Sequence, residues 1–180
     1  MDDLFTTFRQ HAEAAQSQVV EVADWPAAIA FASGLAEKEL VLPATLAEEL
    51  LTDAGTELDL LKFRSPDPDD PVRSVADAEV GLVRGELAVA ETGSVLLVEP
   101  NLIDRTVSML CHTLVEAIPR DRIVASLDDC ATWLSQHTAS HPTANTYATL
   151  STGPSRTADI ERSLTIGVQG PRELYVVVVG

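Results

Sequence analysis

The chain has 180 residues, 46% of them hydrophobic, which is enough apolar material to bury one substantial core. Its formal net charge is −16, from 28 acidic and 12 basic residues, so its surface repels phosphate backbones and anionic lipids. We therefore expect a single domain over residues 1–180, with neither nucleic acid nor a membrane surface as a partner.

The N-terminal residues, the lengths of the apolar stretches and the two cysteines indicate the cellular compartment of the protein and the redox state of its thiols. The first ten residues, MDDLFTTFRQ, are acidic and do not resemble a signal peptide, and no apolar stretch reaches the roughly 20 residues that span a bilayer. Cys111 and Cys130 lie far apart and belong to no C-x-x-C pair, which argues against a disulfide framework or a set of iron-sulfur ligands. We expect a cytoplasmic protein without a membrane span, in which each cysteine packs as a small apolar side chain.

Hydrophobic periodicity predicts alternating helices and strands in the N-terminal half. We expect a helix over residues 2–16, a strand over 19–22, a helix capped by Asp24, a short strand in ELVLP, a helix from Pro43 to Gly55 and a strand in ELDLLKF. The proline- and aspartate-rich segment RSPDPDDPVRS then predicts a surface loop.

The C-terminal half continues the alternation. Ser74 and Asp77 have capping-box spacing and predict a helix over residues 75–83. We further expect a hairpin or a sharply bent strand pair from the apolar runs 87–90 and 95–98, and a strand in HTLVEAIP. A helix in SLDDCATWLSQH capped by Ser126, a strand in TYATLS and a buried strand in ELYVVVVG follow. This order predicts an α/β fold with an open, mostly parallel sheet flanked by helices.

The stretch LSTGPSRTADIERSLTIGVQGP, residues 150–171, is rich in hydroxyl side chains and Gly-Pro pairs. A strand over 147–151 runs into it, and we expect a helix over 156–162. Loops beyond the carboxyl ends of strands bind ligands in open α/β sheets, and Ser155, Arg156 and Thr157 supply donors for a carboxylate or phosphate. The alternative is structural: Ser155 caps the helix and Asp159 holds the loop.

Glu91 is the second candidate, because it ends an apolar strand beside a glycine turn in AETGS. A partly buried carboxyl there would have a raised pKa and serve as general acid, base or nucleophile. The alternative is that it accepts backbone N–H bonds and fixes the turn.

The sequence spacing gives little support to a metal site, a cysteine–histidine pair or a nucleotide-binding motif. His137 and His141 are four residues apart, but Thr138, Ser140 and Pro142 weaken that helix and no third metal ligand is apparent. His112 follows Cys111 directly, and adjacent strand residues point to opposite faces, so they make a poor nucleophile–base pair. No P-loop or dinucleotide fingerprint occurs, and we expect no metal and no cofactor bound through a recognisable motif.

Three motifs in order, AETGS, STGPSRTADIE and GVQGPRELYVVVV, resemble the LUD domain, the lactate utilization protein C family. The resemblance covers residues 77–179. It implies a fold similar to the NagB, ribose-5-phosphate isomerase and CoA-transferase group. It also implies a role in oxidising L-lactate to pyruvate together with iron-sulfur proteins encoded nearby, on which the clusters would reside.

The resemblance, together with the donors of the loop at Ser155–Thr157, implies a ligand site for a small carboxylate or phosphate. Its residues are Thr92, Gly93, Ser94, Gly153, Ser155, Arg156, Thr157, Asp159, Gln169 and Gly170. Two alternatives stay open: an enzyme of CoA-transferase or sugar-phosphate-isomerase type with Glu91 as nucleophile or base, and a non-catalytic interaction subunit.

The chain departs from the family pattern at three positions. It has Gln169 where the family usually has His, Cys111 where Pro is usual, and Ser94 for the commoner Thr. An amide does not titrate, so Gln169 cannot carry protons.

Overall fold

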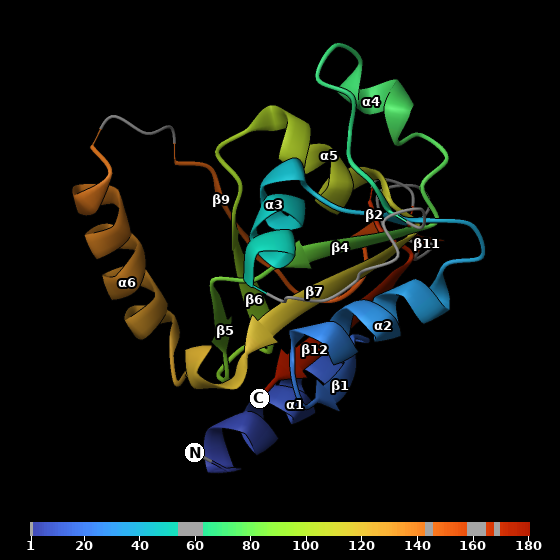
Figure 1. The fold of residues 1–180 in the computed structure, drawn as a ribbon. Coiled ribbons are helices and arrows are strands. Elements are labelled where there is room, and N and C mark those ends of the chain that lie inside the picture. The colour runs from blue at the N-terminus through green and yellow to red at the C-terminus, as the bar shows by residue number, and fades with distance from the viewer. Residues whose placement is uncertain (1, 54–62, 143–145, 158–164, 168–169) are drawn as a thin grey trace.

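The fold is built around a six-stranded sheet in which every strand pairing is parallel (Figure 1). The computed structural model describes residues 2–53, 63–142, 146–157, 165–167 and 170–180. In spatial order the strands are β1 (Gln18–Val22), β12 (Glu173–Val179), β7 (Thr113–Pro119), β4 (Val80–Arg84), β2 (Leu40–Val41) and β3 (Phe63–Arg64). The predicted open parallel sheet is therefore confirmed.

A second sheet packs on one face of the first. Its strands, in spatial order, are β8 (Ile123–Val124), β5 (Leu87–Val89), β6 (Ser94–Val98) and β9 (Ala148–Ser151). The predicted hairpin is confirmed as the antiparallel pair β5–β6, and β9 pairs with the other side of β6. Val95 and Leu97 of β6 share a buried cluster with Leu114 and Val176 of the main sheet. The sequence predicted the hairpin but not this layer.

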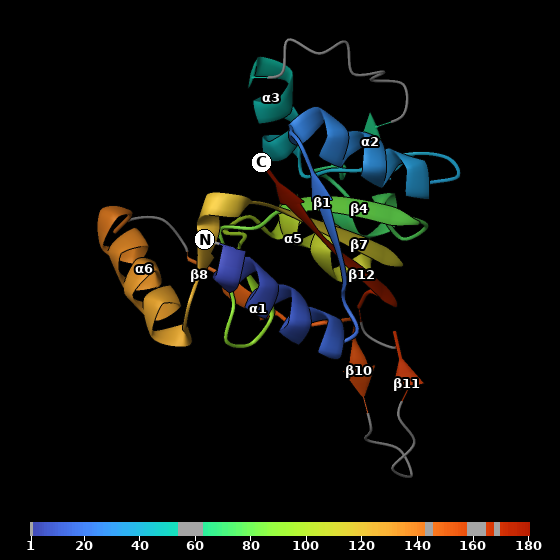
Figure 2. The ribbon, with the colours of Figure 1, turned by 90° about the horizontal axis from the view of Figure 1, so that it is seen from below.

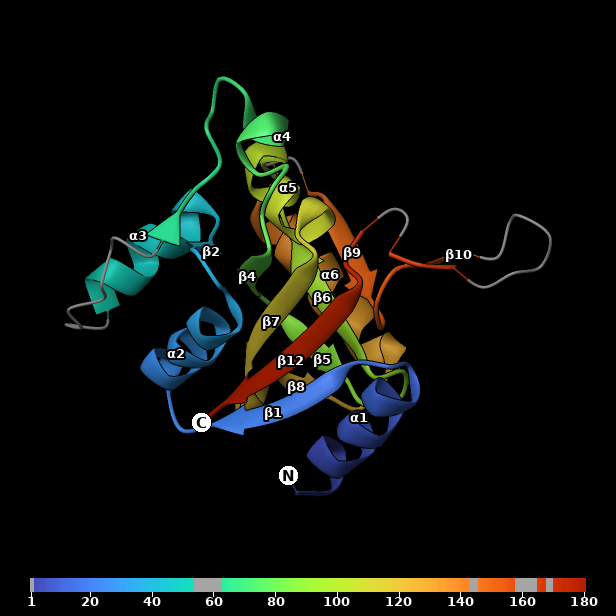
Figure 3. The same cartoon turned by 90° about the vertical axis from the view of Figure 1, so that its right-hand side faces the viewer.

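Helices complete the layers on both faces of the main sheet. They are α1 (Asp2–Ala14), α2 (Trp25–Leu35), α3 (Ala44–Asp53), the short α4 (Pro71–Ser74), α5 (Leu102–Leu110) and α6 (Leu127–Ser140). Helices α2 and α3 bury Ile29 and Leu46 against one face. Helices α1 and α5 bury Phe8 and Val107 against the other, beside the second sheet. Figure 3 shows α2 and α3 on one side of the sheet and α6 beyond the other.

Local capping signals in the sequence correspond to real helix starts. The Asp24 carboxylate accepts the N–H of Ala27 at 2.9 Å and begins α2. Ser126 and Asp129 form a capping box at α6. Both satisfy N–H groups that have no partner inside the helix. The run of valines in β12 is buried, as expected of a strand covered on both faces.

The helix expected over residues 75–83 is wrong, because the chain forms β4 there. Asp70 caps a single helical turn instead, and the Ser74 hydroxyl donates back to the carbonyl of Pro71. The apolar run Val80–Val83 is buried between β2 and β7. Asp77 pairs with Arg64 at 2.7 Å, which lowers the Asp77 pKa through hydrogen bonding and charge.

The helix expected to begin at Arg156 is also wrong. Strand β10 (Arg156–Thr157) pairs antiparallel with β11 (Thr165–Ile166), and Figure 2 shows this hairpin extending from the body of the fold. A helix N-terminus therefore does not supply N–H groups at Arg156. Residues 158–164, most of the predicted strand ELDLLKF and the expected helix end at Gly55 lie outside the described residues.

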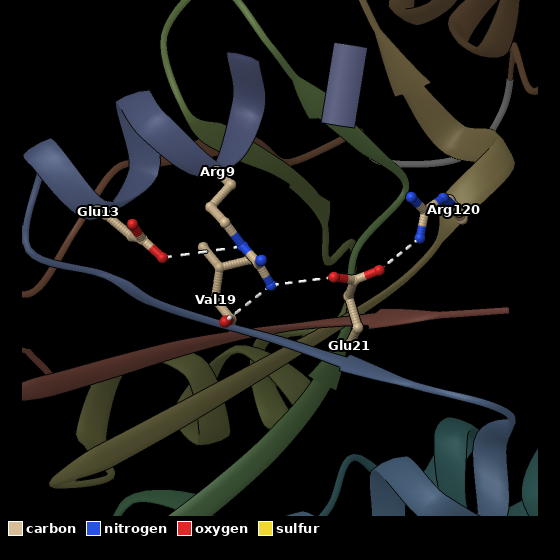
Figure 4. Close-up of polar contacts among 5 residues, drawn as sticks. All are labelled: Arg9, Glu13, Val19, Glu21 and Arg120. Atoms are coloured by element: carbon tan, nitrogen blue, oxygen red, sulfur yellow. Dashed lines mark hydrogen bonds and ion pairs between the residues drawn. The ribbon is translucent and has the colours of Figure 1, made fainter. Parts of the chain in front are cut away.

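In addition to its buried apolar side chains, helix α1 contacts the rest of the fold through the carboxylate of Glu21. Glu21 of β1 accepts from Arg9 of α1 at 3.1 Å and from Arg120 at 2.6 Å (Figure 4). Arg120 belongs to a short 3₁₀ helix (Arg120–Arg122) directly after β7. Both guanidinium groups also lie over the ring of Phe5, at 4.8 and 4.4 Å from its centroid. These contacts add to the burial of Phe8 in placing α1, against which the candidate site is built.

Candidate functional site

The two sequence motifs, 90–94 and 151–157, meet in space through their hydroxyl groups. Ser94 Oγ lies 2.6 Å from Thr152 Oγ1 and donates to Thr92 Oγ1 at 2.8 Å. The contact follows from strand pairing, because Val95 of β6 is the partner of Ser151 in β9. The structure thus brings the predicted residues Thr92 and Ser94 together with the loop that follows β9.

The glycines of both motifs allow helix α1 to approach closely. Gly93 has a φ of 67°, and a Cβ there would lie 2.2 Å from the backbone nitrogen of Ala12. Gly153 has a φ of 72°, and its Cβ would lie 2.0 Å from the carbonyl oxygen of Ala15. Positive φ and these short distances both require glycine. Part of the motif signal therefore reflects packing against the C-terminal end of α1.

Glu91 lies at the surface, next to helix α6. Its Oε2 accepts the backbone N–H of Leu127 at 2.9 Å, and its own N–H donates to Ala125. A carboxylate at a helix N-terminus is favoured by the helix dipole and satisfies a free N–H. This placement agrees with the structural alternative for Glu91.

The strongest candidate site is a cavity of about 470 Å³ next to the second motif, called here the Arg156 pocket. The end of β9, the loop after it and the start of β10 contribute to its wall through Ser151, Thr152, Gly153, Pro154, Ser155 and Arg156. Side chains from β6, β7, α5 and β12 also line it, together with Glu99, which follows β6. Its volume lies within the range of small-molecule sites. Hydroxyl groups and one guanidinium are suited to holding an anion.

The start of the third motif, GVQGP, lies against this loop. The N–H of Ser155 donates to the carbonyl of Pro171 at 2.9 Å, and the N–H of Gly167 donates to the carbonyl of Ser155 at 2.8 Å. A Cβ on Gly170 would lie 3.2 Å from the Cβ of Ser155. Ser155 and Gly170, predicted from separate segments, are thus neighbours. Asp159 and Gln169 lie outside the described residues, and Thr157 is described only as part of strand β10.

Two carboxyl groups at the pocket, the buried Glu116 and the partly buried Glu99, were missed by the sequence analysis. Glu116, in the middle of β7, has no exposed surface, and burial raises its pKa to about 8, with repulsion from Glu99 adding to the rise. The pKa of Glu99 is also raised, first by burial and then by Asp104, against a hydrogen bond from Ser108. The sequence did contain a sign of this group, because Glu116 is a single acid within the apolar run TLVEAIP and a buried charge needs compensation.

The histidines and cysteines that the sequence offered as candidates lie in surroundings that suit packing rather than chemistry. The His137 ring stacks on Trp133 and is tilted against His141. Among the described residues no group of three His, Cys, Asp or Glu side chains is arranged to hold a metal ion. Both cysteines are buried free thiols, and burial raises the Cys111 pKa to about 12. Cys111 has a φ of −66°, which is the value that proline imposes, so the departure from proline at this position leaves the backbone unchanged.

The fold and this pocket define an open parallel α/β protein with a candidate anion site at a strand-ending loop. The family model of the LUD domain matches residues 6–179, and the chain belongs to this family. The match extends well beyond the motif-bearing half. In the described part of the chain, helices fall short of the length and apolarity needed to cross a bilayer.

Curated relatives match the chain over a shorter region. Lactate utilization protein C of Bacillus subtilis (strain 168) is 32% identical over 111 residues, which cover 61% of this chain and 46% of that protein. Lactate utilization protein C of Shouchella clausii (strain KSM-K16) is 36% identical over 113 residues, covering 61% and 49%. The matched region thus spans about half the length of these relatives.

A solved structure resembles the chain over its whole length. The crystal structure of a DUF162 family protein from Deinococcus radiodurans has a TM-score of 0.70 at 18% identity, covering 99% of this chain and 98% of that one. At this identity the likeness establishes the fold.

Proposed function

We propose that this chain takes part in lactate utilization and that it binds a small carboxylate in the Arg156 pocket. Membership of the LUD domain family and relatives named lactate utilization protein C support the role. The observation that carries the ligand assignment is the pocket wall formed by Ser151, Thr152, Ser155 and Arg156, residues of the motif stretch itself. In a chain of net charge −16, the guanidinium of Arg156, an exposed side chain that lines the cavity, is a local attraction for an anion.

Oxidation of lactate removes two electrons, and the groups that accept them belong, in this proposal, to iron-sulfur partner proteins. The chain has two cysteines, both buried free thiols, whereas a cluster is usually held by four. Free thiols also favour a cytoplasmic location.

A role as a non-catalytic interaction subunit is the second candidate. It is favoured by β9, which is an edge strand of the second sheet and exposes Leu150, and by the exposed Met109 of α5. An enzyme of CoA-transferase or sugar-phosphate-isomerase type with Glu91 as nucleophile or base has less support. The Glu91 carboxylate is exposed and holds the N–H of Leu127.

Thermal unfolding with added L-lactate, pyruvate, inorganic phosphate or CoA tests the ligand. A ligand that binds only the folded state raises the Tm. We expect at least one carboxylate to raise the Tm of the unaltered protein and of an Arg73→Ala control, whose side chain is exposed on α4, but not of Arg156→Ala. Absence of a shift with every ligand, or equal shifts in Arg156→Ala, argues against the site.

Gene deletion tests the pathway, and a tagged copy tests the partners. We expect the deletion strain to lose growth on L-lactate while it grows normally on glucose, and iron-sulfur proteins to co-purify with the tagged chain. Normal growth on lactate removes the pathway assignment. Co-purification without any ligand-induced Tm shift favours the interaction subunit.

A further inference from the structure

The Arg156 pocket lies near the amino ends of strands in the main sheet. Leu114 and Leu174, which line it, are the second residues of β7 and β12. All pairings in this sheet are parallel, so the carboxyl ends of its strands lie together at the opposite edge. Ligands of open parallel α/β sheets generally bind beyond the carboxyl ends of the strands. The carboxyl edge is therefore a second location at which a ligand site is expected.

A cavity of about 310 Å³ lies at this carboxyl edge and is called here the Trp25 pocket. Arg84, which lines it, is the last residue of β4, and Asp24 and Trp25 follow the end of β1. Helix α3 supplies further lining residues. No described residue lines both this cavity and the Arg156 pocket, so the two are separate.

Apolar side chains form one part of the Trp25 pocket. Leu46 and Leu50 are four residues apart on α3, so they lie on the same face of that helix, and both are buried. Trp25 and Pro26 begin α2 and contribute a partly buried indole and a proline ring. At roughly 30 Å³ per water molecule in the liquid, the cavity holds about ten non-hydrogen atoms, which is the size of a purine base. Its size and composition suit a flat ring.

Charged groups form the exposed part of the pocket. Arg84 Nη1 donates to Glu49 Oε2 at 3.0 Å, and the Arg84 guanidinium carbon lies 5.6 Å from the centroid of the Trp25 ring. Asp24 adds a second carboxylate. Two acids thus face one arginine that already has a carboxylate partner, so the pocket favours a neutral or cationic ligand over an anion. Carboxylate oxygens accept hydrogen bonds and select a ligand that donates them.

We propose that the Trp25 pocket binds a planar nitrogen heterocycle that carries an amino group and no negative charge, of the class of the aminopurines. The ring packs against Trp25, Leu46 and Leu50, and the amino group donates to Glu49. Arg84 has N–H groups beyond the one that Glu49 accepts, and these can donate to a ring nitrogen. This inference goes beyond the proposed function and does not depend on it.

Tryptophan fluorescence with adenine as the probe tests the site. The chain has two tryptophans, Trp25 and Trp133, so Trp133→Phe leaves Trp25 as the one indole emitter. In this variant we expect adenine to quench the emission saturably. Calorimetric titration of the unaltered protein should show purine, which lacks the amino group, binding about tenfold more weakly than adenine, the effect of one hydrogen bond to a charged group. Benzoate, a flat anion, should bind more weakly than either.

Substitutions at the pocket separate stacking from hydrogen bonding. Trp25→Leu should weaken adenine binding about tenfold or more, whereas Trp25→Phe keeps an aromatic ring and should retain most of the affinity. Glu49→Ala should abolish the preference for adenine over purine. Glu48→Ala is the matched control, because Glu48 is the neighbouring exposed acid of α3 and does not line the pocket. Since Glu49 is exposed, its variant tests the site even if Trp25→Leu fails to fold.

The results that would overturn the proposal are equally specific. Absence of adenine binding, or equal adenine affinity in Trp25→Leu and the unaltered protein, contradicts the site. Benzoate binding as tightly as adenine contradicts the ligand class. Arg156→Ala should bind adenine as the unaltered protein does, so the Trp25 pocket and the Arg156 pocket can each fail without the other.

Discussion

Ser94 Oγ lies 2.6 Å from Thr152 Oγ1, and this contact joins two segments that are 58 residues apart in sequence. Ser94 begins strand β6, and Thr152 follows strand β9, its antiparallel neighbour. The same hydroxyl of Ser94 reaches Thr92 in the preceding turn. The loop that carries Arg156 is thereby tied to the hairpin turn of the first motif, and both rest on helix α1 through Gly93 and Gly153.

Replacing Ser94 by alanine should therefore destabilise the protein. Ser94 is buried, and its removal leaves the Thr92 and Thr152 hydroxyls without a common partner. We expect the free energy of unfolding to fall by about 1 kcal/mol in urea denaturation. Ser135→Ala, on the exposed face of α6, is the matched control and should change it by less than about 0.5 kcal/mol. Equal effects of the two variants would show that the hydroxyl contact contributes nothing measurable.

Gly153→Ala should have a larger effect. The added Cβ would lie 2.0 Å from the carbonyl oxygen of Ala15, and φ is 72°, where L-residues are strained. We expect a loss of about 2 kcal/mol or more, measured by urea denaturation. The control is Gly34→Ala in α2, where a Cβ meets nothing within 4 Å; there stability should be unchanged or rise by up to about 1 kcal/mol. Similar values for both substitutions contradict the close approach of α1.

The parts of the fold that the sequence predicted are those specified by local signals. Asp24 and Ser126 cap their helices with their own side chains, and the four valines before Gly180 form a buried strand in any parallel sheet. The hairpin between β5 and β6 follows from the Thr92–Ser94 turn, with Gly93 at positive φ.

The parts that the sequence did not predict depend on distant partners. Val80–Val83 forms a strand because β2 and β7 lie on either side of it, and this outweighs the local capping signal of Ser74 and Asp77. Arg156 lies in a strand because Ile166 pairs with it. For the site, the motifs predicted the loop that carries Arg156. The sequence did not predict Glu99 and Glu116, because the packing of the two sheets brings them beside the pocket.

Glu21 should contribute modestly to the position of α1. It accepts from Arg9 and Arg120, but all three side chains are partly exposed, so solvent screens the charges. We expect Glu21→Gln to lower the free energy of unfolding by roughly 0.5–1 kcal/mol at low salt, and by less in 1 M NaCl. Glu13→Gln, whose carboxylate lies 3.8 Å from Arg9, should have a smaller effect. A loss that does not depend on salt would mean that packing, rather than charge, is disturbed.

Glu116 should make the stability of the protein depend on pH. Its pKa is about 8 in the folded protein against an ordinary value of 4.5, so the folded state binds one more proton than the unfolded state between these values. The folded state is therefore favoured most below about pH 4.5, and this contribution is lost as the pH rises toward 8, by up to about 1.4 kcal/mol per pH unit.

Urea denaturation of the unaltered protein and of Glu116→Gln at pH 5, 6, 7 and 8 isolates this contribution, because other titrating groups are common to both. An amide in place of the carboxyl does not ionise, so the variant should gain stability relative to the unaltered protein steadily from pH 5 to pH 8. Curves that run parallel over this range would mean that Glu116 takes up no proton on folding. Glu116 would then already be ionised in the folded protein at pH 5, contrary to the rise of its pKa that burial causes.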